Sequence, residues 1–137
     1  MRLNVVVDEV LEGITGRFGI TVADYLVLAV VRRSPDHRSS PTAICTVLGR
    51  TTGGMSLALD RLESAGRVRR LPDPNDRRRV VIEATRRGIR LAADVNAALH
   101  EWEASLGATP TQRDRIDRAL AELTTLIRRD LDIPRRG

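Results

Sequence analysis

The 137-residue sequence contains no lysine, so its 23 basic side chains are all arginine. Against 18 acidic residues they give a formal net charge of +5. A basic excess of this kind favours polyanionic partners. We interpret the exclusive use of arginine as genomic codon bias, because nothing in nucleic-acid binding excludes lysine.

Cysteine and histidine are nearly absent. Cys45 is the single cysteine, which excludes an internal disulfide and a Cys-x-x-Cys metal or redox pair. The two histidines, His37 and His100, lie far apart and near no serine or cysteine that their spacing would pair with them. We therefore expect no metal, no cofactor and no enzymatic activity.

Aromatic side chains are equally scarce, with only Phe18, Tyr25 and Trp102 in the whole sequence. Modules that bind single-stranded nucleic acids usually stack the bases on aromatic side chains. Among polyanions, double-stranded DNA is therefore the better candidate.

Long apolar runs are missing as well. No run approaches the roughly 20 residues of a membrane span, and the N-terminus lacks the features of a secretory signal. We expect a cytoplasmic protein with no membrane partner. The length suits one domain whose burial a partner subunit would assist.

The basic charge is concentrated in one stretch. Positions 61–90 hold ten arginines but only four acidic residues, a local balance of +6 that exceeds the whole-chain value. The remainder of the chain is therefore about neutral, and the polyanion is expected to meet this stretch.

Helix signals mark the first third of the chain. Apolar residues recur at helical spacing from Leu3 to Ile14, which predicts a short first helix. Thr21 followed by Asp24 resembles a capping box, and it opens a second helix that ends near Arg33. The segment 34–40 is predicted to be a loop.

Two short helices and a hairpin come next. Ser40 and Pro41 start a third helix that Gly49 closes. A fourth follows a tight turn and stops at Gly66, and the segments 67–71 and 77–84 predict a two-stranded hairpin around a turn at 72–76. Helix, turn, helix, hairpin is the order of a winged helix-turn-helix.

Two further helices are predicted after the hairpin. Thr85 caps a long helix through about Leu106, and Thr109 with Pro110 caps an amphipathic last helix. Neither helix is needed to complete a winged helix. The expected fold class is mainly α (α+β), in which terminal helices flank a lobe with a two-stranded β-wing.

The fourth helix is predicted to enter the DNA major groove, as the second helix of a helix-turn-helix does. Its N-terminal run, Thr51-Thr52-Gly53-Gly54, is costly for a helix, since each glycine costs on the order of 1 kcal/mol relative to alanine. Close approach of the first-turn N–H groups to a phosphate would favour small residues there. A loosely wound first turn is the alternative interpretation.

Leu57 faces outward in the middle of this helix, where it could contact a thymine methyl group. A single exposed leucine is also ordinary and needs no function. Arg50 and Arg61 are interpreted as phosphate contacts, with simple solvation as the alternative.

The three consecutive arginines Arg77, Arg78 and Arg79 lie near the tip of the predicted hairpin. Such a tip can reach the minor groove, whose narrow walls focus negative potential on a guanidinium. Asp76 could fold back and fix the direction of Arg78 through a charge-assisted bond. A merely soluble charged tip is the alternative, although the neighbouring arginines Arg69, Arg70, Arg86 and Arg87 extend the patch. Arg86 and Arg87 stand in the first turn of a helix, where the dipole disfavours cations and an external anion would relieve them.

These readings predict a DNA-binding surface made of Ser40, Arg50, Thr51, Thr52, Gly53, Ser56, Leu57, Arg61, Arg70, Asp76, Arg77, Arg78 and Arg79.

The stretch 59–88 resembles the multiple-antibiotic-resistance regulator (MarR) family. The family pattern joins a helix ending D-R-L-E-x-x-G to a wing D-P-x-D-x-R and a helix opening T-x-x-G. The matching residues are Asp60, Arg61, Leu62, Glu63, Gly66, Asp73, Pro74, Asp76, Arg78, Thr85 and Gly88. Departures at Ala58, Arg67 and Ala84 leave the expected fold unchanged. Peroxide-sensing relatives use a cysteine in the first helix, whereas Cys45 occupies a core-like position in the third.

The resemblance implies a homodimeric repressor that binds a palindromic operator and is released by a small, often phenolic, compound. It implies one MarR-type domain over 1–137, with a DNA-binding lobe at 20–88 and dimerisation helices at 1–16 and 89–133. Independently of the resemblance, the last helix carries an apolar stripe that a winged helix alone does not bury, which predicts an obligate dimer. The expected dimerisation residues are Val6, Val10, Ile116, Leu120, Leu123 and Ile127. A ligand-insensitive architectural or anti-regulator protein on the same fold is the alternative function.

Overall fold

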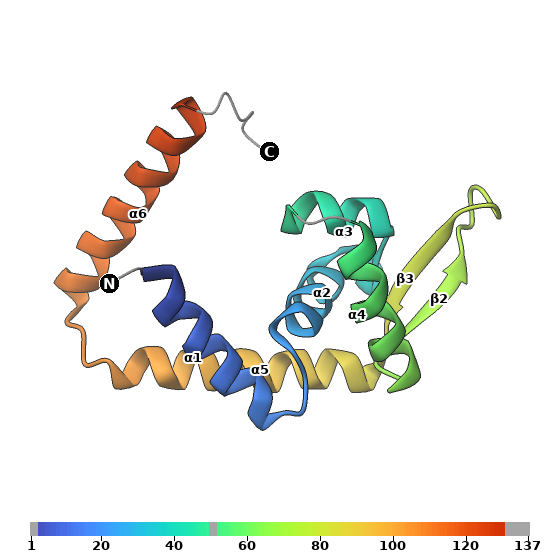
Figure 1. The fold of residues 1–137 in the computed structure, drawn as a ribbon, viewed down its shortest axis with the longest axis horizontal. Coiled ribbons are helices and arrows are strands. Elements are labelled where there is room, and N and C mark those ends of the chain that lie inside the picture. The colour runs from blue at the N-terminus through green and yellow to red at the C-terminus, as the bar shows by residue number, and fades with distance from the viewer. Residues whose placement is uncertain (1–2, 50–51, 131–137) are drawn as a thin grey trace. The chain divides into compact units, whose positions relative to one another are not determined.

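Helices α1 to α6 account for most of the chain in the computed structural model, which describes residues 3–49 and 52–130 (Figure 1). They are α1 (Leu3–Arg17), α2 (Val22–Arg33), α3 (Pro41–Leu48), α4 (Thr52–Ser64), α5 (Arg86–Ser105) and α6 (Pro110–Asp130). Two strands of a small antiparallel sheet come between α4 and α5 in chain order, and its third strand comes between α2 and α3. The predicted winged-helix class is confirmed.

The predicted caps explain where these helices begin. Thr21 Oγ1 accepts the backbone N–H of Asp24 at 3.1 Å, and the Asp24 carboxylate accepts the N–H of Thr21 at 3.2 Å. These two bonds complete the capping box of α2. Ser40 Oγ accepts the N–H of Ala43 at 3.1 Å at the start of α3, and Gly49 ends that helix with a left-handed φ of 62°.

The start of α5 is fixed against the chain that follows α4. Thr85 Oγ1 accepts the N–H of Gly88 at 3.2 Å and donates to the carbonyl oxygen of Gly66 at 2.8 Å. A Cβ at Gly88 would lie 2.0 Å from the carbonyl oxygen of Arg67, so only glycine fits there. The T-x-x-G pattern therefore reflects a close backbone contact between the start of α5 and the residues that precede β2.

The sheet has three strands, one more than predicted. Its order is β1 (Arg38–Ser39), β3 (Val80–Ala84), β2 (Val68–Pro72), and both pairs are antiparallel. The segment 34–40 is therefore not all loop, since it holds β1 and a short 3-10 helix, η1 (Pro35–His37). The predicted second strand was too long, because β3 begins only at Val80 and the three arginines lie in the turn.

Two apolar clusters form the core. The larger joins α2, α3, α4 and the sheet through fully buried Leu28, Ile44, Leu62 and Ile82, and Cys45 packs against it. Cys45 Sγ lies 4.0 Å from Met55 Sδ, which agrees with a structural role for the thiol. The smaller cluster joins α1, α2 and α5 through Ile14, Ile20, Tyr25, Val95 and Ala98.

The chain divides into two units, Met1–His100 and Glu101–Gly137. All the core residues belong to the first unit, and the described residues of α6 in the second are exposed. The division falls within α5, and the assignment of a DNA-binding lobe to 20–88 and of dimerisation helices to 1–16 and 89–133 stays a prediction. No single helix in the described ranges is long and apolar enough to cross a membrane, while α1 from Val5 and α2 pass that test only as a pair bent by 80°.

Candidate nucleic-acid interface

One face of α4 is buried and the other is open. Met55, Ala58, Leu59 and Leu62 join the core, whereas Gly53, Gly54, Ser56 and Leu57 face solvent. Leu57 is 63% exposed, as its place in the helical period predicted. Thr52 begins the helix, while the predicted site residues Arg50 and Thr51 lie outside the described residues.

Packing within the protein does not require glycine at the two positions near the start of α4. A Cβ built on Gly53 or Gly54 would find no atom within 4 Å. Each nevertheless lowers the intrinsic stability of the helix. Both positions face outward, and the absence of a Cβ there would let a phosphate approach the helix backbone closely.

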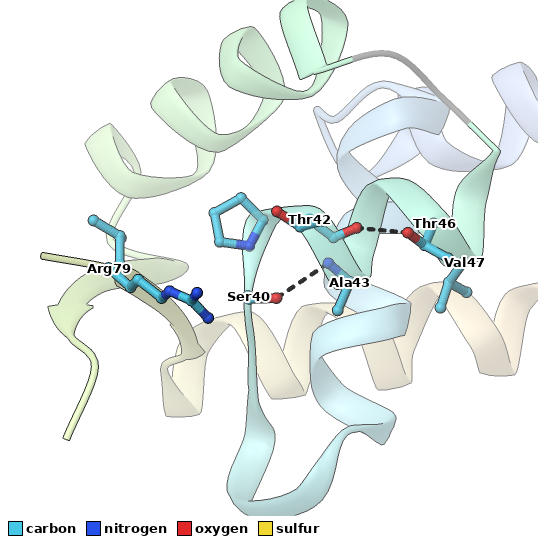
Figure 2. A pocket seen from close by; sticks show the side chains of 8 residues that line it. Ser40, Thr42, Ala43, Thr46, Val47 and Arg79 are labelled. Atoms are coloured by element: carbon cyan, nitrogen blue, oxygen red, sulfur yellow. Dashed lines mark hydrogen bonds between the residues drawn. The ribbon is translucent and has the colours of Figure 1, made fainter. Parts of the chain in front are cut away.

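A groove of about 830 Å³ separates α3 from the hairpin, and Figure 2 shows its lining. The lining residues are Ser40, Pro41, Thr42, Ala43, Thr46, Val47, Arg79 and Val80. The predicted site residue Ser40 lies here as the cap of α3 and shares the groove with Arg79 from the hairpin turn. Sequence reasoning missed Thr42, Thr46 and Val47, although their exposed positions on α3 could have been read from its helical period.

The turn between β2 and β3 is built by two aspartates. Asp73 Oδ1 accepts the N–H of Asn75 at 2.8 Å, and Asp76 Oδ1 accepts the N–H of Arg78 at 3.0 Å. The carbonyl oxygen of Asp76 also accepts the N–H of Arg79 at 2.9 Å. Side-chain bonds of this type stabilise turns locally, and they bend the chain before the three arginines can join the strand.

Asp76 therefore binds the backbone N–H of Arg78. The sequence had suggested a charge-assisted bond to the Arg78 guanidinium instead. Asp76 Oδ2 lies 3.7 Å from Nε of Arg79, which is its only ion-pair partner among the described side chains. Arg77 and Arg78 are exposed and form no ion pair with a described residue. The turn thus presents two uncompensated guanidinium groups to solvent.

Arg61 is ion-paired within the protein rather than free to contact a ligand. Its Nη2 lies 2.8 Å and its Nε 3.1 Å from Asp24 Oδ1, and Asp24 is only 4% exposed. The hydrogen bond to Asp24 raises the pKa of the Arg61 guanidinium. The residue predicted to contact phosphate therefore joins the last turn of α4 to the start of α2.

Arg70 is similarly occupied. Its Nη2 lies 2.6 Å from Asp60 Oδ1, its Nη1 contacts Glu63, and its backbone N–H donates to Glu63 at 3.2 Å. Hydrogen bonds to Asp60 and then to Glu63 raise the pKa of this guanidinium. Much of its charge is therefore balanced by two acids on α4.

A third ion-paired group crosses the sheet. Arg38 Nη2 lies 2.6 Å from Glu83 Oε2, and Arg69 Nη2 lies 2.5 Å from Glu83 Oε1. Hydrogen bonds from Arg38 and then from Arg69 hold the pKa of the buried Glu83 carboxyl below its usual range. The two strand arginines thus share one acidic partner, Glu83, whereas Arg77 and Arg78 of the turn have none among the described residues.

No described cluster of three or more histidine, cysteine, aspartate or glutamate side chains could hold a metal ion. The site consists of arginines, hydroxyl groups and exposed apolar side chains around α3, α4 and the turn. This chemistry suits contacts with phosphates and base edges.

Comparison with known proteins identifies the family. Residues 18–79 match the MarR family model. The chain is 32% identical over 91 residues to the HTH-type transcriptional regulator PecS of Dickeya dadantii, which covers 66% of this chain and 55% of PecS. It is 30% identical over 110 residues to the HTH-type transcriptional regulator PapX of Escherichia coli, which covers 77% of this chain and 67% of PapX. The chain thus spans about half the length of PecS and two thirds of PapX.

Solved structures agree with these relatives. A mutant of MarR from E. coli complexed with operator DNA superposes with a TM-score of 0.73 at 28% sequence identity. The match covers 88% of this chain and 86% of that one. On this sequence and structural evidence, the chain belongs to the MarR family.

Proposed function

We propose that this chain is a transcriptional regulator that binds double-stranded DNA as a cytoplasmic homodimer. The observation that carries the proposal is the pair of exposed, unpaired guanidinium groups of Arg77 and Arg78 at the hairpin turn. Arg61 on α4 and Arg69 and Arg70 on β2 each have an acidic partner, so the unpaired charge of the wing lies at its turn, where a wing meets a minor groove. The likeness to MarR complexed with operator DNA supports the same assignment.

In this proposal α4 enters the major groove with its open face toward the bases. Leu57 supplies an apolar contact for a thymine methyl group, and Gly53 and Gly54 allow a phosphate to approach the helix start. The groove between α3 and the turn accepts the sugar-phosphate backbone, with Ser40 and Arg79 on its two sides. Phosphate contacts of this kind fix position, whereas base contacts give specificity.

The homodimer is proposed from the apolar stripe of α6. Ile116, Leu120, Leu123 and Ile127 lie at helical spacing and are each about half exposed. A second copy of the chain would bury them, since contiguous exposed apolar patches mark interaction sites. On α1, Val5 and Val7 are exposed, whereas the predicted contacts Val6 and Val10 are partly buried and Val10 packs on the smaller core cluster.

We further propose repression and release by a small aromatic compound, as family membership suggests. A hollow of about 490 Å³ between α1 and the start of α2 is one place for such a compound. Asp8 and Glu12 line it, which favours an uncharged phenol over an aromatic carboxylate.

The proposal is tested with the DNA upstream of the protein's own gene. Nuclease protection at about 150 mM salt should reveal a palindrome whose half-sites are about one helical turn apart. Deletion of the gene should raise expression from that promoter. In the wild type, addition of an uncharged phenol should raise expression in the same way. Equal affinity for the upstream fragment and an unrelated duplex of the same length would reject specific regulation.

A further inference from the structure

A second group of arginines lies away from the surface described above. It surrounds a pocket of about 360 Å³ lined by Arg67, Arg86, Arg87, Arg90, Leu91 and Asp94. Arg67 follows the end of α4, and the other five residues stand on the first turns of α5. The Thr85 hydroxyl holds these two segments together through the carbonyl oxygens of Gly66 and Arg67, so the pocket has a fixed frame.

The charges in this pocket are not balanced. Four guanidinium groups face one carboxylate, and none of the four arginines forms an ion pair with a residue in the described ranges. This differs from Arg38, Arg61, Arg69 and Arg70, each of which has an acidic partner. The first turn of α5 contains no acid, so its dipole adds to the repulsion among the arginines. An anion in the pocket would offset both effects.

The pocket lies at the opposite end of the hairpin from the three turn arginines. Arg67 precedes the first residue of β2, and β2 runs for five residues before the turn, a length of roughly 16 Å. Figure 1 shows α5 beginning at the end of β2 and β3 that is remote from their connecting turn. A DNA backbone held at the turn and α3 does not require these arginines, which leaves them for a separate ligand.

We propose that this pocket binds a small phosphate-bearing anion with more than one negative charge. Guanidinium groups pair with phosphate oxygens through two parallel hydrogen bonds, and four of them suit a diphosphate better than a single carboxylate. The volume matches a small metabolite. Leu91 is the one apolar side chain in the lining, so the pocket is poorly suited to an aromatic effector.

Isothermal titration of the full-length protein with inorganic pyrophosphate at about 150 mM salt tests the site. We expect one pyrophosphate per chain, and about tenfold weaker binding for Arg87→Ala and Arg90→Ala, the scale of a lost charge-assisted hydrogen bond. Asp94→Asn should bind pyrophosphate more tightly, because it removes the one negative charge in the lining. The matched control Arg78→Ala, an exposed arginine of the turn, should bind pyrophosphate like the wild type. Circular dichroism verifies that each variant is folded.

Other results would overturn the proposal. Several weak sites per chain, or equal weakening by Arg78→Ala, would show diffuse attraction to a basic surface. If Arg87→Ala and Arg90→Ala bind pyrophosphate normally but bind operator DNA with a reduced salt slope, these arginines contact the DNA backbone instead. The titration contains no DNA, so a failure of the proposed regulatory function leaves its result unaffected.

Discussion

Arg61 on α4 and the buried carboxylate of Asp24 on α2 form a two-point ion pair, with Nη2 and Nε 2.8 Å and 3.1 Å from Oδ1. Asp24 also caps α2 by accepting the N–H of Thr21. The pair therefore fixes the proposed recognition helix to the start of the central core helix. The pair also neutralises the Arg61 guanidinium, which the sequence had suggested as a phosphate contact.

Substitution of Arg61 should therefore affect the stability of the fold more directly than DNA binding. We expect Arg61→Ala to lower the free energy of unfolding by about 1–3 kcal/mol, because it leaves the Asp24 carboxylate buried without its cation while Arg61 itself is half-exposed. Urea unfolding measures this, with Arg77→Ala as an exposed arginine control that should unfold like the wild type. Unchanged stability together with a salt slope reduced by about one would instead restore Arg61 as a phosphate contact.

Arg78 should carry a large share of wing binding. We expect Arg78→Ala to weaken operator binding by about 1–3 kcal/mol and to reduce the salt slope by about one, with the fold unchanged. Salt-titrated binding to the operator and to an unrelated duplex measures both quantities. A salt slope equal to that of the wild type would remove Arg78 from the interface.

Asp76 should contribute through the turn that it builds. Asp76→Ala loses the bond to the Arg78 N–H and should weaken operator binding, whereas Asp76→Asn keeps an acceptor at that position without the negative charge. We therefore expect Asp76→Asn to bind as well as the wild type or better. If Asp76→Ala binds the operator more tightly than the wild type, the ordered turn is unimportant and the wing is only a basic patch.

Leu57 should affect the choice of bases more than the overall affinity. One contact with a thymine methyl group carries discrimination and little of the electrostatic attraction, so Leu57→Ala should relax the preference at one base pair. Competition among operators altered one base pair at a time measures the profile. Val47→Ala, an exposed apolar residue on α3, serves as the control and should leave the profile unchanged. An unaltered profile for Leu57→Ala would mean that this leucine is merely exposed.

The apolar stripe of α6 should hold the dimer. We expect Leu120→Glu with Leu123→Glu to give a monomer in analytical ultracentrifugation, because charges would replace apolar contacts with the second copy. Thr125→Glu, on the opposite face of the same helix by its 100° period, should remain dimeric. The sequence predicts that truncation after Gly107 leaves aggregated or unfolded protein. Point variants are the better test, because the truncated chain would keep every core residue, all of which lie within 1–100. A dimeric double variant would disprove the stripe as the interface.

Glu83 should make stability depend on pH. Because Arg38 and Arg69 lower its pKa in the folded protein, its stabilisation is complete above the unfolded value of about 4.3 and is lost as pH falls through the lower folded value. Glu83→Gln should cost about 1–2 kcal/mol of unfolding free energy at pH 7, and the difference from the wild type should vanish in acid. Urea unfolding at pH 7 and pH 3 measures the difference, with Glu12→Gln, a substitution of an exposed acid on α1, as the matched control. A constant difference for Glu83→Gln would contradict the lowered pKa.

The helix boundaries follow from signals that lie within a few residues of one another. Thr21 with Asp24, Ser40 with Pro41, and Gly49 determine local hydrogen bonds, and the structure confirms each of these caps. Helical spacing likewise predicted that Leu57 faces outward, because the period of an α-helix does not depend on distant residues.

The partners of the arginines depend on tertiary structure, because a guanidinium binds whichever carboxylate folding brings near. Arg61 meets Asp24 across 37 positions, and Arg38 meets Glu83 across 45 once β1 pairs with β3. The sequence by itself determined that arginines would crowd this part of the chain, together with the helices and turns that carry them. Only the packing of α2, α4 and the sheet decided that Arg61 and Arg70 are neutralised while Arg77 and Arg78 remain open, since charge compensation is set by distances through space.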